Sequence, residues 1–178
     1  QQGNEHRGVL TYGPVSLVWY GSFTHTRAAD SETARWLDAA LGSVDGSPWK
    51  IVAAHHPLTG KHGPGPDEPS QARQRKLFAE VMQKHGVVLH LSGHIHCYDR
   101  SEPIIWRDKA WHLDPGGITY AVVGTGGVGQ CGTSPGWRYS AVSSQYFYGT
   151  TLIEATQDEL SLSLISESGQ IVDEQSWF

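Results

Sequence analysis

Two stretches of the chain, residues 49–57 (WKIVAAHHP) and residues 87–96 (VVLHLSGHIH), decide the fold. Each opens with a short apolar run of the length of a buried strand and ends in a pair of histidines. A helical pattern lies between them, with Leu77, Phe78 and Val81 on its inner face. This strand–helix–strand order predicts a parallel pair of strands and therefore an α/β fold.

The flanking sequence predicts further elements around this unit. Residues 9–20 indicate two short strands that meet at Gly13-Pro14. A helix is expected to begin near 30–32 and to end at Gly42. We therefore expect a parallel βαβ centre followed by antiparallel C-terminal strands, in a single domain over residues 1–178. The strands expected to be antiparallel span 102–106, 119–124, 146–155, 159–166 and 170–177.

Composition excludes several classes of protein. A chain of 178 residues with a net charge of −5 lacks the basic surplus of a nucleic-acid binder. No apolar run approaches the length of about 18 residues that a membrane-spanning helix requires. No leader is visible, so we expect any signal peptide to be removed already and the protein to be secreted, extracellular or periplasmic. Cys97 and Cys131 form either one disulfide or two free thiols.

The histidines at the two strand ends indicate a metal site. Ligands bind in open α/β sheets at the carboxyl ends of the parallel strands. His55-His56 and His94-x-His96 are therefore expected at one edge of the sheet, with Gly93 allowing a sharp backbone turn. Imidazole is a common metal ligand, and two such pairs at equivalent strand ends favour a metal site.

Several motifs resemble one known family. They are residues 52–57 (VAAHHP), 61–65 (KHGPG), 91–100 (LSGHIHCYDR) and 118–127 (ITYAVVGTGG). Together they are similar to the later motifs of the calcineurin-like metallophosphoesterases, and most of all to those of purple acid phosphatases. The resemblance implies that the chain is the later half of an αββα metallophosphoesterase sandwich.

The resemblance also implies metals. Members of the family hold two metal ions side by side, and iron, zinc or manganese is expected here. Asn4, His55 and His94 would bind one ion, and His96 would bind the other. The Asp-x-His and Gly-Asp-x-x-Tyr motifs that supply carboxylates are absent, so this chain alone would hold two ions only if the site is completed, and otherwise one or none.

The implied activity is that of an acid phosphatase. A phosphate monoester would be hydrolysed by a metal-bound hydroxide, and His62 would contact the phosphate and protonate the leaving group. His6 stands one place later than the histidine of the family's Gly-Asn-His-Glu motif, and is carried over as a substrate contact. The alternative is a catalytically incomplete domain with a structural or assembly role. Expected partners are the phosphate ester and either a missing N-terminal segment, a second chain or a further copy of this one.

Four nearby residues have less specific interpretations. By resemblance, His56 replaces an aromatic residue and is interpreted as a pocket wall rather than a ligand. His90 is predicted to be a hydrogen-bonded core residue, because it lies inside an apolar strand. Tyr98 and Arg100 either line the site or serve as a packing tyrosine and a salt-bridging arginine.

Overall fold

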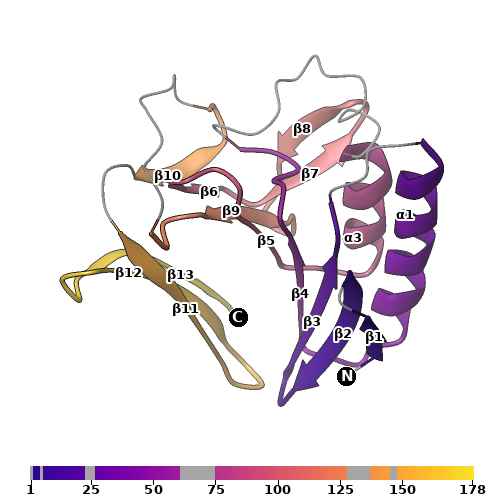
Figure 1. Cartoon of the computed structure of the whole chain (residues 1–178), viewed down its shortest axis with the longest axis horizontal. Coiled ribbons are helices and arrows are strands. Elements are labelled where there is room, and N and C mark those ends of the chain that lie inside the picture. The colour runs from indigo at the N-terminus through magenta and orange to yellow at the C-terminus, as the bar shows by residue number, and fades with distance from the viewer. Residues whose placement is uncertain (1, 5, 23–26, 61–74, 128–136, 145–147) are drawn as a thin grey trace.

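Three layers make up the part of the chain that the structure describes (Figure 1). The structure is a computed structural model that describes residues 2–4, 6–22, 27–60, 75–127, 137–144 and 148–178. Helices α1 (Arg27–Gly42) and α3 (Glu80–Lys84) cover one face of an eight-stranded sheet. A three-stranded sheet packs on the opposite face. The α/β class expected from the sequence is confirmed.

The centre of the large sheet is parallel. Strand β3 pairs in parallel with β4, β4 with β5, and β5 with β9, while the outer pairs are antiparallel. The predicted βαβ unit is therefore present as β4 and β5 with α3 between them. In spatial order the strands are β1 (Gln2–Asn4), β2 (Arg7–Tyr12), β3 (Val15–Tyr20), β4 (Trp49–Ala54), β5 (Leu89–Ser92), β9 (Thr119–Val123), β6 (Tyr98–Ser101) and β10 (Ser140–Ser144).

Strand β9 corrects one expectation. The segment 119–124 was expected among the antiparallel strands, yet Thr119 pairs with Leu89 and Val122 with Ser92 in parallel register. The first four residues of β9 are buried, with Ala121 in the core between the two sheets and Tyr120 in the core against the helices. A continuous apolar run of this kind is typical of a parallel strand covered on both faces.

The second sheet consists of three antiparallel strands that end the chain, as expected. They are β11 (Gly149–Ala155), β12 (Leu160–Ser166) and β13 (Ile171–Trp177). Leu160, Leu162 and Leu164 of β12 are fully buried against the large sheet. A separate hairpin joins β7 (Ile104–Arg107) to β8 (Ala110–Leu113).

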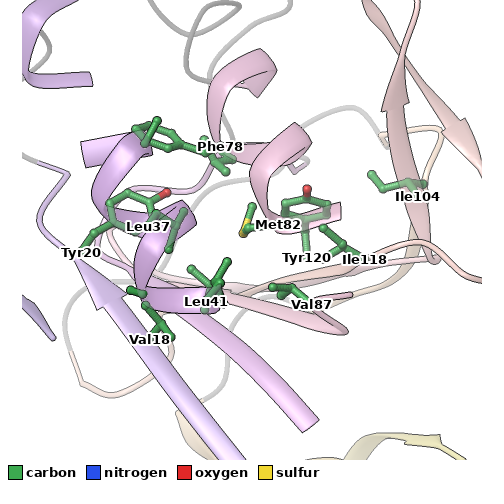
Figure 2. Packing of buried hydrophobic residues seen from close by; sticks show 14 of the residues in the cluster. Val18, Tyr20, Leu37, Leu41, Phe78, Met82, Val87, Ile104, Ile118 and Tyr120 are labelled. Carbon is green, nitrogen blue, oxygen red and sulfur yellow. The ribbon is translucent and has the colours of Figure 1, made fainter. Parts of the chain in front are cut away.

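The helices pack on the large sheet through a second core (Figure 2). Leu37 and Leu41 of α1 meet Met82 of α3 over Val18 and Tyr120 of the sheet. Helix α1 begins at Arg27, several residues before the expected start, and ends at Gly42 as expected. A π-helical turn, η1, spans Arg75–Ala79 and leads into α3. The predicted inner face is confirmed, since Phe78 is buried in this core while Leu77 and Val81 pack against it.

Candidate metal centre

One row of paired residues crosses the sheet and defines the edge at which the candidate residues lie. Strands β3, β4 and β5 all end at this row, so the segments that follow them leave the sheet side by side. The turn between β1 and β2 reaches the same edge, because β2 is antiparallel to β3. The row is Asn4, Arg7, Tyr20, Ala54, Ser92 and Val122.

Three imidazoles gather at this edge. His55 and His56 follow β4, and His94 follows β5. One ring nitrogen from each lies within 4.8 Å of the others. His55 Nε2 is 3.2 Å from His94 Nδ1. The ring centroids of His56 and His94 are 4.4 Å apart, and the two loops are joined by a 3.0 Å hydrogen bond from the Gly93 N–H to the His55 carbonyl.

Ser22 holds His56 from the neighbouring strand end. The backbone N–H of His56 donates to Ser22 Oγ at 2.9 Å, and His56 Nδ1 lies 2.9 Å from the same oxygen. Ser22 stands two residues after the end of β3, and β3 is the parallel neighbour of β4. The ring of His56 is therefore oriented by a residue that is 34 positions away in the sequence.

His94 occupies a strained backbone conformation. Its φ angle is 65°, in the left-handed region, and the Ile95 N–H donates to the Gly93 carbonyl at 2.7 Å across it. This hydrogen bond closes a three-residue γ-turn of the positive-φ kind, which is rare because it is strained. The sharp turn was expected at Gly93, but it falls on His94 instead. Strain of this type concentrates at functional sites, where surrounding contacts hold the residue in place.

The other candidate residues are placed less completely. Asn4 ends β1 in the row described above, and His6 lies exposed in the turn that follows. His96 lies in the segment between β5 and β6, outside the group of three imidazoles. His62 and Cys131 lie outside the described residues, whereas Cys97 is buried. The roles of Asn4, His6, His62 and His96 therefore stay predictions.

Tyr98 and Arg100 anchor the sheet behind the site. The Tyr98 hydroxyl donates to Asp173 Oδ2 at 2.6 Å, and Arg100 donates to both oxygens of the same carboxylate at 2.6 and 2.9 Å. Burial raises the pKa of Asp173, but the bonds from Arg100 and Tyr98 outweigh it and lower that pKa. Burial and the contact with Asp173 raise the pKa of Tyr98. The second interpretation of the pair is confirmed: they tie β6 to β13 and do not line the site.

His90 departs from its expected role. It is fully buried, as expected, but neither ring nitrogen has a hydrogen-bond partner. Its ring lies 5.4 Å from that of Tyr120 and 6.5 Å from that of Tyr20. Burial lowers the pKa of His90 to about 4, so the ring is neutral at pH 7.

The three imidazoles fit a borderline metal ion. Zn–N bonds of 2.0–2.1 Å at a tetrahedral angle place two ligand nitrogens about 3.3 Å apart. The separation of 3.2 Å between His55 Nε2 and His94 Nδ1, which is also that of a hydrogen bond between the two rings, matches that value. Neutral nitrogen ligands suit zinc, iron or copper better than magnesium or calcium. Within the described residues, no carboxylate joins this group.

Sequence reasoning missed the part that His56 takes in this cluster. The only signal was its position directly after His55 at a strand end. The contribution of Ser22 had no sequence signal, because it depends on β3 lying beside β4.

Comparison with known proteins identifies the family. The calcineurin-like phosphoesterase family profile matches residues 2–98, which hold both histidine pairs and more than half of the chain. The chain belongs to the calcineurin-like phosphoesterase family. The resemblance seen in the motifs is thus confirmed. Purple acid phosphatases are among the relatives, as the motifs implied.

Three relatives illustrate the extent of the match. Purple acid phosphatase 21 of Arabidopsis thaliana is 33% identical over 117 residues, covering 64% of this chain and 25% of that protein. Acid phosphatase of Aspergillus ficuum is 37% identical over 94 residues, covering 52% of this chain and 14% of that protein. The solved structure of purple acid phosphatase from yellow lupin (Lupinus luteus) seeds has a TM-score of 0.80 at 21% identity, covering 96% of this chain and 32% of that one. The chain therefore spans about a quarter of the first relative and a third or less of the others.

Among the described residues, no helix has both the length and the apolar character needed to cross a bilayer.

Proposed function

We propose that this chain is part of a metal-dependent phosphoesterase that hydrolyses phosphate monoesters, as acid phosphatases do. The observation that carries the proposal is the gathering of His55, His56 and His94 at the carboxyl edge of the parallel strands, in a chain of the calcineurin-like phosphoesterase family. The relatives named above are acid phosphatases, which supports the reaction class.

Each candidate residue would have a role in metal binding or catalysis. His55 and His94 would hold a metal ion, Asn4 would add an amide ligand, and His96 would serve a second ion. The chemistry that such ions supply is charge neutralisation at the phosphoryl oxygens and activation of water. His62 would donate a proton to the departing alkoxide, and His6 would contact the phosphate.

A second candidate function is a structural or assembly role without catalysis. The observation that favours it is the all-imidazole composition of the described cluster, since carboxylate bridges hold metal pairs together in this family. A purely neutral ligand set compensates less of the metal charge. For either candidate function, we also propose that the protein is secreted.

Hydrolysis of p-nitrophenyl phosphate tests the first candidate. The chain, loaded with zinc, iron or manganese, is compared with His94→Asn, because asparagine tolerates the positive φ at this position better than most residues. We expect the variant to lose more than about 100-fold in activity, beyond the 10–100-fold that loss of an outer-shell partner costs.

The control is His112→Asn. His112 lies on β8 and bonds to the Arg107 carbonyl, away from the cluster. This variant should keep the wild-type rate. Metal binding without hydrolysis in any metal form would contradict the enzymatic proposal and favour the structural role.

A further inference from the structure

We propose that His56 is a metal ligand that completes a three-imidazole cation site with His55 and His94, and that Ser22 is its positioning residue. The site lies within this chain and takes a borderline divalent cation such as zinc. The inference rests on the proposed function, because it adds a ligand to the metal site at the same edge of the sheet. It does not require that the chain hydrolyse anything.

The first support is the position of the His56 ring. It packs against both other imidazoles, with ring centroids 4.8 Å from His55 and 4.4 Å from His94. A pocket wall would need only the bulk of the side chain. Here a nitrogen of His56 also falls within 4.8 Å of nitrogens on both neighbours. Since tetrahedral zinc places its nitrogens about 3.3 Å apart, an adjustment of about 1.5 Å or less closes the site around an ion.

The second support is the hydrogen bonding of Ser22. A hydroxyl oxygen has two lone pairs and can accept two hydrogen bonds. Ser22 Oγ lies 2.9 Å from both the backbone nitrogen and Nδ1 of His56, so it can accept from both N–H groups. In that tautomer the lone pair of the ring is on Nε2. Metal-ligating histidines are oriented in this way, by a hydrogen bond from the nitrogen that does not face the metal.

The third support is the backbone of the loops. The γ-turn at His94 and the hydrogen bond from Gly93 to His55 hold the β5 loop against the β4 loop. His55 and His94 are exposed, so a cation can reach them from solvent, whereas His56 is half-buried and hydrogen-bonded to Ser22. The arrangement is an open site with one anchored ligand.

Cobalt(II) titration tests the proposal without reference to activity. Cobalt reports its coordination geometry through visible absorption and follows zinc in its choice of ligands. The variant His56→Phe keeps the bulk of a wall and removes the nitrogens. We expect its cobalt affinity, measured by calorimetry, to fall by about 100-fold, as loss of a ligand should exceed loss of an outer-shell partner. The matched control, His112→Phe, should bind as the wild type does.

Three further variants make the test independent of folding losses. In His56→Cys a thiolate replaces the imidazole, and contact with cobalt produces a sulfur-to-metal charge-transfer band in the near ultraviolet. Ser22→Ala should weaken binding by about 10-fold or more, and Ser22→Thr, which keeps the hydroxyl, should restore it. Circular dichroism of each variant confirms that the fold is intact.

The outcomes separate this inference from the proposed function. Wild-type affinity in His56→Phe, or cobalt binding by His56→Cys without the charge-transfer band, would overturn it. Weakened binding in His56→Phe together with the band would support it. That support would stand even if p-nitrophenyl phosphate is not hydrolysed, in which case only the enzymatic proposal fails.

Discussion

At the scale of single residues, the burial of His90 makes the stability of the fold depend on pH. Its ring is enclosed by Tyr20 and Tyr120, and both of its nitrogens lack a hydrogen-bond partner. Protonation would place an uncompensated charge in the core, which is why burial lowers the pKa to about 4. In the unfolded chain a histidine titrates near 6.5.

The pH dependence of stability follows from this difference in pKa. Because the folded pKa of His90 is depressed, its contribution is fully present above about pH 6.5 and is lost as the pH falls towards 4. We expect the free energy of unfolding to fall by roughly 2–3 kcal/mol from this group between pH 7.5 and 4.5. Urea unfolding at the two pH values measures the loss, and His90→Leu should reduce it by that amount. An equal loss in wild type and variant would contradict this account.

At the scale of elements, the end of β9 and the loop that carries His94 and His96 lie in close contact. A Cβ atom at Gly124 would lie 2.0 Å from the Ile95 carbonyl oxygen, and the Gly124 N–H donates to the Cys97 carbonyl at 3.1 Å. Glycine is needed here for the close approach of two backbones, not for an unusual φ angle. The backbone of Gly124 thus packs directly against Ile95, which lies between His94 and His96 in the sequence.

Alanine substitution tests this contact. Gly124→Ala must displace Ile95, which lies between two candidate ligands, so we expect a loss of about 2 kcal/mol or more in unfolding free energy and weaker cobalt binding. Gly126→Ala is the matched control, because a Cβ there meets nothing within 4 Å. Its unfolding free energy should stay within about 0.5 kcal/mol of the wild-type value. Equal behaviour of the two variants in urea unfolding would argue against the close approach.

A buried ionic contact joins two elements that are distant in sequence. Arg100 on β6 and Asp173 on β13 form an ion pair, and their side chains are only 6% and 5% exposed. Removing one partner of such a pair leaves an uncompensated buried charge and costs about 3–5 kcal/mol. The contact therefore holds the three-stranded sheet against the strand that follows His96.

At the scale of the whole molecule, the eight-stranded sheet ends in strands β1 and β10, each with one neighbour among the described residues. Unpaired strand edges favour pairing with another chain or segment. We therefore propose that the isolated chain associates with itself or with a completing partner. Sedimentation velocity over a range of concentrations should show species heavier than 19.5 kDa. A monomer that persists at all concentrations would refute the proposal.

The sequence by itself determined the central strand–helix–strand unit and the edge of the sheet that carries the histidines. Strand β4 has the predicted bounds of 49–54, because an apolar run ended by His-His-Pro is specified by neighbouring residues alone. His55 and His94 could be placed at one edge from the sequence, since parallel strands joined by a helix must end on the same side. The family motifs, which are also local in sequence, supported the same placement.

The tertiary structure decided what depends on which strands become neighbours. The bond from Ser22 to His56 exists because β3 lies beside β4, and the contact between Arg100 and Asp173 spans 73 positions of the chain. The direction of β9 was set by burial on both faces of the sheet, and the turn at His94 by its loop contacts. Periodicity reports how one segment meets solvent, whereas pairing and side-chain contact depend on free energies shared between distant segments.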